Sequence, residues 1–184
     1  KLSHVFADGE LLTITGDEVA DAIRERTNGA IDIQTFPNGQ IACYKEGVEQ
    51  VVRGANFISV EDPSYLGDYV PDFNILAGPM IVSSFDEWEY LLQTDLVKSM
   101  FADAEKAGIK ILTLDIINGF RSMKTSKPIN TPADLKGMKI RTPMSETYVG
   151  TLNAMGANAI GMAFSETISA VQSGVVDGLE GTIG

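Results

Sequence analysis

The first half of the chain switches repeatedly between a helical and a strand-like hydrophobic period. Residues 11–26 place Leu12, Val19 and Ile23 among charged neighbours before a Thr-Asn-Gly stop signal, which predicts a helix. A second helical pattern follows, with apolar residues at spacings of three and four over residues 48–55. Strand-like segments flank these helices at residues 1–6, 30–36 and 56–60. Because helix-length segments separate the strands, we expect parallel pairing in an α/β layer structure.

The middle of the chain predicts a passage from one domain to another. Residues 62–80 are rich in proline and glycine and predict a long surface loop. Two helices are expected near residues 85–93 and 95–106, and the apolar run 109–116 is expected to be a strand that leaves one sheet for another. We therefore expect the N-terminal portion of a first α/β domain at residues 1–116.

A second α/β domain is expected to begin at residue 117, with its N-terminal portion reaching residue 178. Thr131-Pro132-Ala133-Asp134 is a compact helix start, in which Asp134 can bond back to the capping Thr131. Further expected elements alternate along this half: a strand at 139–141, a helix at 145–156, a strand at 159–162, a helix from a Ser165 cap to Gly174, and a strand from Val175. Residues 179–184 are expected to begin a crossover strand back toward the first domain.

Composition removes several classes of function. The formal net charge of −11 argues against binding to nucleic acid or to an anionic membrane surface. No apolar run is long enough to cross a bilayer. The chain opens on a strand-like segment, so an export signal is either absent or already removed. The single cysteine, Cys43, predicts a packing residue, and the single histidine, His4, leaves no two-histidine zinc site, so we expect no metal and no cofactor.

Several motifs occur along the chain in a fixed order. The downstream ones are Asn118-Gly119-Phe120-Arg121, the run from Thr131 to Arg141, Met162-Ala163-Phe164-Ser165-Glu166 and Gly174-Val175-Val176-Asp177-Gly178. The upstream ones are Thr27-Asn28-Gly29, Phe36-Pro37-Asn38-Gly39-Gln40 and Pro63-Ser64-Tyr65-Leu66-Gly67. In this order the chain resembles the extracytoplasmic solute-binding proteins of tripartite ATP-independent periplasmic (TRAP) transporters, the DctP-like dicarboxylate-binding family.

The resemblance implies a periplasmic-binding-protein-like fold of two domains that close on a ligand in the cleft between them. It implies a periplasmic monomer without a cofactor, which captures a small organic acid and delivers it to membrane permease subunits energised by a sodium gradient. It marks Arg141 as the clamp on the ligand carboxylate and Arg121 as a second basic group. It also places Phe164 against the ligand, with Glu61 and Asp62 on the facing domain.

The residues themselves agree with these roles but leave alternatives open. A guanidinium offers parallel donors to a carboxylate, and Arg141 follows a short strand at a sheet edge. Arg141 could instead be a surface residue or pair with Glu166 or Asp177. For the other positions, Arg121 could bridge the domains, Phe164 could be a core aromatic, and Glu61 and Asp62 could form a solvated turn. Acids facing the cleft favour a hydroxy acid or sugar acid over a plain dicarboxylate.

Two departures from the family pattern limit what can be carried over. Gly181 stands where the family usually has an asparagine that binds the ligand, so it leaves room for a bulkier ligand or exposes backbone amides. Family members also continue well beyond the length of this chain, so we expect a C-terminal part of both domains to be missing. Competing hypotheses are the sensing domain of a receptor and an enzyme that uses Glu61, Asp62 or Glu166 as a base, although no cofactor-binding loop is present.

Overall fold

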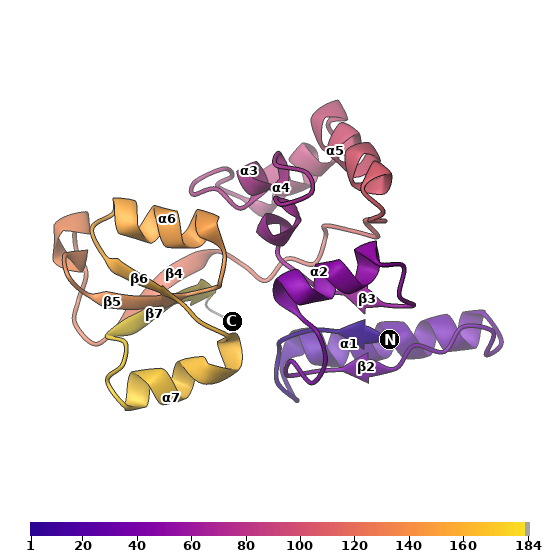
Figure 1. The fold of residues 1–184 in the computed structure, drawn as a ribbon, viewed down its shortest axis with the longest axis horizontal. Helices are drawn as coiled ribbons and strands as arrows, with labels where there is room; N and C mark the ends of the chain where they lie inside the picture. Colours follow the sequence, from indigo (N-terminus) through magenta and orange to yellow (C-terminus); the bar gives the residue numbers. More distant parts are fainter. Residues whose placement is uncertain (183–184) are drawn as a thin grey trace.

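A parallel sheet of three short strands organises the first part of the chain. The computed structural model describes residues 1–182 (Figure 1). Strands β1 (Leu2–Ser3), β2 (Thr35–Phe36) and β3 (Ile58–Ser59) pair in the order β2-β1-β3. Helices α1 (Leu11–Arg26) and α2 (Tyr44–Val52) connect them, which confirms the predicted parallel pairing. We call this sheet, with its helices through α5, the first unit.

The segment predicted as a long surface loop is partly helical. It forms a 3₁₀ helix, η1 (Pro63–Leu66), and the short helix α3 (Phe73–Leu76). Asp62 caps η1 by accepting a hydrogen bond from the Ser64 amide at 2.9 Å. Apolar side chains of this segment are buried, including Phe73 at 0% exposure. This packing stabilises helical turns, which the proline and glycine content of the segment did not predict.

Two capped helices complete the first unit as expected. Helices α4 (Phe85–Leu92) and α5 (Asp95–Lys106) begin at Ser84 and Thr94, whose side chains accept backbone amide hydrogen bonds. On α5, Val97, Met100 and Ala104 face the core of the unit, which agrees with the helical period of the sequence.

The strand predicted at residues 109–116 is wrong. This segment has no strand pairing, and its contacts are made by side chains instead. Ile109 is buried in the first core, and the Trp88 indole donates to the carbonyl of Leu114 at 3.1 Å. An apolar run whose side chains pack in this way has the same sequence pattern as a buried strand. Hydrophobicity predicts that the side chains are buried, but it does not predict whether the backbone pairs with another strand.

A second sheet contains the remaining strands. Strands β4 (Arg121–Thr125), β5 (Lys139–Thr142), β6 (Asn158–Gly161) and β7 (Gly178–Thr182) lie in the order β4-β7-β5-β6. Strand β4 runs antiparallel to β7, whereas β5 is parallel to both β6 and β7. Figure 1 shows helices α6 (Glu146–Ala154) and α7 (Thr167–Gln172) on opposite sides of this sheet. We call this the second unit.

Three details of the second unit bear on the sequence predictions. The capping box at Thr131 is confirmed, at the start of the 3₁₀ helix η2 (Pro132–Leu135). The predicted Ser165 cap is wrong, because Ser165 lies inside the 3₁₀ helix η3 (Phe164–Glu166), which leads directly into α7. The last strand begins at Gly178 rather than Val175, because the amide of Val175 bonds back to α7. The proposed domain limits, including a return to the first domain beyond Thr182, stay predictions.

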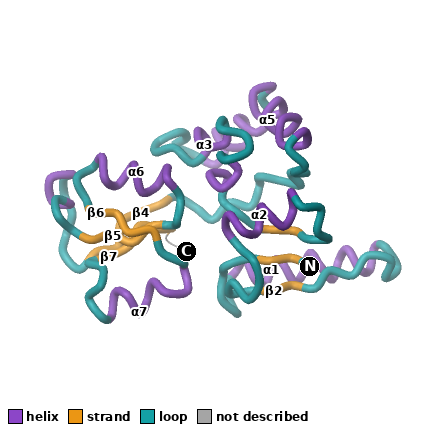
Figure 2. Tube along the Cα trace, viewed as in Figure 1, coloured by secondary structure: helices purple, strands orange, loops and turns teal. Residues whose placement is uncertain are grey.

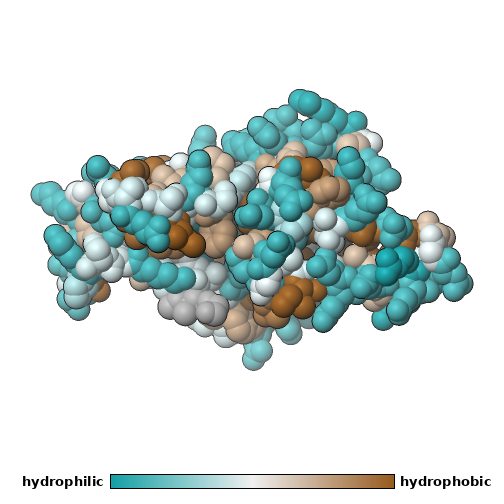
Figure 3. Space-filling model, turned by 90° about the horizontal axis from the view of Figure 1, so that it is seen from below, coloured by the Kyte–Doolittle hydropathy of each residue, from teal (hydrophilic) through white to brown (hydrophobic). Residues whose placement is uncertain are grey.

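The two units have separate hydrophobic cores, and their strands form two distinct groups in Figure 2. Leu135, Ile140 and Leu152 anchor the second core. The surface mixes polar and apolar patches on the face seen in Figure 3. Among residues 1–182, no helix has the length and apolar character needed to span a membrane.

Candidate functional site

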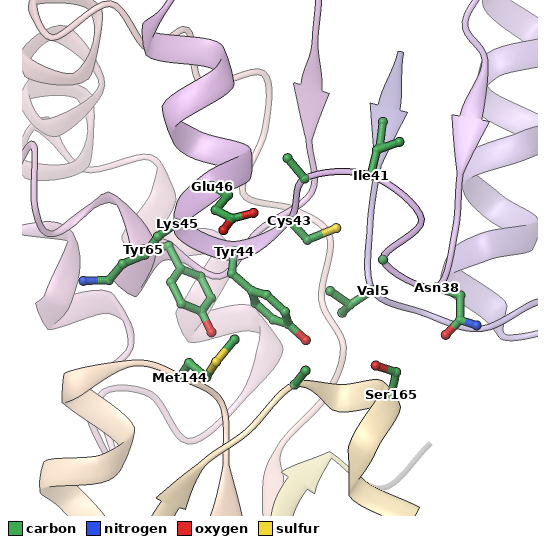
Figure 4. A pocket seen from close by; sticks show the side chains of 13 residues that line it. Val5, Asn38, Ile41, Cys43, Tyr44, Lys45, Glu46, Tyr65, Met144 and Ser165 are labelled. Atoms are coloured by element: carbon green, nitrogen blue, oxygen red, sulfur yellow. The ribbon is translucent and has the colours of Figure 1, made fainter.

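A cavity of about 520 Å³ lies where the two units meet (Figure 4). The first unit lines it with Val5, Tyr65 and the segment from Asn38 to Glu46, and the second unit contributes Met144, Ala163 and Ser165. Figure 4 shows the Tyr65 ring directed toward Met144, and the Tyr44 ring directed toward the segment of the second unit that leads to Ser165. The Tyr65 hydroxyl is buried and has no hydrogen-bond partner within residues 1–182.

Tyr44 joins the two walls of the cavity. It opens helix α2 with a φ of 58°, a left-handed conformation that non-glycine residues seldom adopt. Its amide donates to Glu61 Oε1 at 2.7 Å within the first unit. Its hydroxyl accepts a hydrogen bond from the backbone amide of Phe164, in the second unit, at 2.9 Å. Phe164 also approaches Phe6 of the first unit, with ring centroids 6.3 Å apart.

Arg141 is buried, with 3% of its surface exposed, so the alternative of a surface arginine is wrong. Its Nε and Nη2 donate to the carbonyl of Met162 at 3.1 and 2.7 Å, and its Cζ lies 5.6 Å from the centre of the Phe164 ring. No carboxylate within the described residues pairs with this guanidinium, and neither Glu166 nor Asp177 fills that role. Burial lowers the pKa of Arg141, which is the effect expected for a charge that lacks a close counter-ion.

Arg121 has the opposite environment. Its guanidinium forms a two-pronged ion pair with Glu180, including a contact of 2.9 Å from Nη2 to Oε2. Burial by itself lowers the pKa of Arg121, but the hydrogen bonds and charge of Glu180 outweigh burial and raise it. This ion pair joins β4 to β7 inside one sheet, so it does not bridge the domains directly. The Arg121 Cζ also lies 4.5 Å above the ring of Tyr148.

The two acids expected on the facing domain have different surroundings. Asp62 uses both carboxylate oxygens inside the protein: Oδ1 caps Ser64, and Oδ2 accepts from the Tyr148 hydroxyl at 2.6 Å. Glu61 Oε1 accepts from the Tyr44 amide and from the Ser59 hydroxyl, each at 2.7 Å. Burial raises the pKa of Glu61 to about 7 despite these hydrogen bonds. Neither acid forms a solvated turn, because both are partly buried and hydrogen-bonded.

The predicted residues therefore fall into two clusters. Arg141 and Phe164 lie together, linked through Tyr44 to Glu61, whereas Arg121 and Asp62 are linked through Tyr148. Gly181 lies in β7 opposite Ser122, and a β-carbon added there would meet only Leu179 Cδ1, at 3.8 Å. That geometry agrees with room beside the strand. The ligand contacts of all six predicted residues, Arg141, Arg121, Phe164, Glu61, Asp62 and Gly181, stay predictions.

Sequence reasoning missed three residues of this region: Tyr44, Tyr148 and Glu180. Tyr148 falls within the helix predicted at residues 145–156, and Glu180 directly precedes Gly181, but neither residue has a local pattern that indicates its partners. Cys43 is a buried packing residue with its sulfur 2.9 Å from the Ser3 hydroxyl, and His4 is buried as well. Within residues 1–182, no group of three or more potential ligand side chains could hold a metal ion.

Comparison with protein families decides the assignment. Residues 2–184 match the family model of DctP, the bacterial extracellular solute-binding protein family 7. The chain belongs to this family. The predicted resemblance and the extracytoplasmic location are thereby confirmed. The DctP family consists of solute-binding proteins of transporters rather than enzymes.

Among curated members of the family, the C4-dicarboxylate-binding periplasmic protein DctP of Rhodobacter capsulatus is 32% identical over 181 residues. That alignment covers 98% of this chain and 54% of the relative. The chain thus spans about half the length of the curated relatives it matches.

Solved structures of the family confirm the predicted two-domain, periplasmic-binding-protein-like α/β fold. A TRAP periplasmic solute-binding protein from Desulfovibrio salexigens, in complex with diglycerolphosphate, is 65% identical with a TM-score of 0.96, over 98% of this chain and 58% of that chain. One from Fusobacterium nucleatum, with bound sn-glycerol 3-phosphate, is 42% identical with a TM-score of 0.96, over 98% and 59%. One from Actinobacillus succinogenes, with bound L-galactonate, is 34% identical with a TM-score of 0.91, over 97% and 60%.

Proposed function

We propose that this chain forms the ligand cleft of a TRAP solute-binding protein that captures a small organic anion and delivers it to membrane permease subunits. The observation that carries the proposal is Arg141. Its guanidinium is buried at the junction of the units, held by a backbone carbonyl, and unpaired with any described carboxylate. A buried charge without a counter-ion is costly, and an anionic ligand would neutralise it.

Bidentate recognition by Arg141 suits a carboxylate, such as that of a sugar acid or hydroxy acid. The donors left over from the Met162 contact would bind the two carboxylate oxygens, and charge-assisted hydrogen bonds of this kind contribute about 1.5–3 kcal/mol each. The rest of the cavity suits hydroxyl groups. The unpartnered Tyr65 hydroxyl lies in the cavity lining and can bond to them, while Tyr44 packs alongside.

A phosphate ester of glycerol is the second candidate, and the bound relatives favour it specifically. The structures that share 65% and 42% identity with this chain contain glycerol phosphates, whereas the sugar-acid structure from Actinobacillus succinogenes shares 34%. An arginine fork matches phosphate oxygens as well as carboxylate oxygens.

A thermal-shift panel tests the proposal and ranks the two candidates. The panel contains L-galactonate, D-glucuronate, succinate, sn-glycerol 3-phosphate and diglycerolphosphate, with uncharged glycerol as the matched control. An anion at one hundred times its dissociation constant stabilises the fold by about 2.7 kcal/mol, whereas glycerol leaves the melting temperature unchanged. Stabilisation by no anion, or equal stabilisation by glycerol, contradicts the proposal.

A further inference from the structure

Tyr148 contacts both the first unit and the Arg121 side chain of the second unit. It lies on α6, and none of the sequence motifs includes it. Its hydroxyl donates to Asp62 of the first unit at 2.6 Å, and its ring lies under the Arg121 guanidinium at 4.5 Å. One side chain therefore contacts the facing unit with one end and a basic residue of its own sheet with its ring.

Both partners of Tyr148 are held firmly. Asp62 is fixed because its other oxygen caps η1 through the Ser64 amide. Arg121 is fixed by Glu180, whose Oε2 also accepts from the buried Thr142 hydroxyl at 3.0 Å. Thr142 follows Arg141 directly on β5. A continuous chain of contacts thus runs from the first unit through Tyr148 to the strand that carries Arg141.

The hydroxyl of Tyr148 remains a donor throughout the physiological pH range. Burial and the neighbouring charge of Asp62 raise its pKa above the ordinary tyrosine value. A hydrogen bond from a neutral hydroxyl to a carboxylate is one of the stronger kinds, because its acceptor is charged. Of the other hydrogen bonds between the units, Thr147 to Asn74 is exposed and longer, at 3.2 Å.

We propose that Tyr148 is a positioning residue that holds the two units together over the cavity and fixes Arg121, so that it sets how long a ligand stays bound. The effect on the ligand rests on the function proposed above. The effect on the arrangement of the units does not, because the Tyr148 to Asp62 contact is made by two protein side chains alone.

Tyr148→Phe tests the proposal, since it removes the hydroxyl and keeps the ring beneath Arg121. The first measurement uses no ligand: the distance between spin labels on the two units, which we expect to lengthen or broaden in the variant. The second measures ligand kinetics with sn-glycerol 3-phosphate and L-galactonate as probes. We expect the dissociation rate to rise about tenfold while the association rate stays within about twofold.

Two further variants make the test specific. Tyr90→Phe on α4 is the matched control, because Tyr90 is 74% exposed, and it should change neither measurement. Asp62→Asn weakens the same contact from the other side, and combined with Tyr148→Phe it should add less than about twofold to the dissociation rate.

Independent, multiplying effects of the two substitutions, or a Tyr148→Phe protein with unchanged distances, overturn the proposal. A distance change without binding of either probe leaves the positioning role standing and counts against the proposed function instead. A changed association rate with an unchanged dissociation rate contradicts the role assigned to Tyr148 in ligand retention.

Discussion

Arg121 and Arg141 lie on the two strands that flank β7, yet the surroundings of their guanidiniums differ. Arg121 has a carboxylate partner in Glu180, and the hydrogen bonds and charge of that partner outweigh burial and raise its pKa. Arg141 has a backbone carbonyl in place of a carboxylate, and burial lowers its pKa. Arg141 is also the more deeply buried of the two, with 3% of its surface exposed against 31% of the Arg121 side chain, so the arginine without a carboxylate partner is the one farther from water.

On the function proposed above, the difference separates a structural charge, that of Arg121, from a charge that binds the ligand, that of Arg141. An ion pair completed within the protein contributes to holding β4 against β7 whether or not a ligand is bound. A buried charge whose counter-ion is the ligand lowers the stability of the unliganded protein and raises its affinity for the ligand. Binding sites often lower stability in this way. Replacing each arginine with the uncharged, similarly long methionine therefore tests the comparison directly.

The largest expected effect is on stability. Arg121→Met leaves Glu180 buried without its partner, and removal of one member of a buried pair costs about 3 kcal/mol or more. Because Arg121 is partly exposed, we expect the lower end of that range, measured as the free energy of unfolding in urea. If Glu180→Gln in the same background restores no stability, the loss does not come from the stranded carboxylate.

The next effect is on affinity. Arg141→Met should weaken anion binding by about 2 kcal/mol, or about thirtyfold, because it removes the charge-assisted contact. The same change should leave the free energy of unfolding of the unliganded protein unchanged or higher, since it removes an unpaired buried charge. Calorimetric titration and urea unfolding of one preparation give both values. A variant that is both unstable and fully able to bind would reverse the roles of the two arginines.

A smaller effect extends the comparison to the two acids. Asp62 accepts hydrogen bonds from Tyr148 and Ser64. Glu61 has no cationic partner among residues 1–182, and its pKa is about 7. Its unfolded value is near 4.5, so the folded protein binds the extra proton between these values. The contribution of Glu61 to stability is then greatest below about pH 4.5 and falls as the pH rises to about 7, by up to about 1.4 kcal/mol per pH unit.

Glu61→Gln should flatten that slope, which can be followed by urea unfolding across the pH range. The amide cannot titrate but can still accept from Tyr44 and Ser59. Asp62→Asn serves as the comparison, because it leaves Glu61 in place and removes only the smallest contribution to its raised pKa, so most of the slope should remain. An equal slope in wild type and Glu61→Gln would assign the pH dependence to other groups.

The sequence predicted local features better than contacts between distant residues. Helix α5 and the capping box at Thr131 follow from spacing and capping chemistry within a few residues, and both are present. The supposed strand at residues 109–116 failed because its apolar side chains pack on a core without a backbone partner. Arg141 could be singled out by motif resemblance. The roles of Tyr148 and Glu180 could not, since they depend on partners 86 and 59 residues away.

The two hydrogen bonds from Arg141 to the Met162 carbonyl have a stereochemical consequence. One carbonyl accepts from Nε and from one side of Nη2, which fixes the orientation of a planar group. Of the donors that remain, one on each Nη atom lies side by side at the terminal edge of that group. On the function proposed above, an anion bound at that edge would lie in the plane of the guanidinium. Mirror-image ligands held in one plane would direct their hydroxyls to opposite sides of it, so the proposed site would distinguish handedness as well as charge.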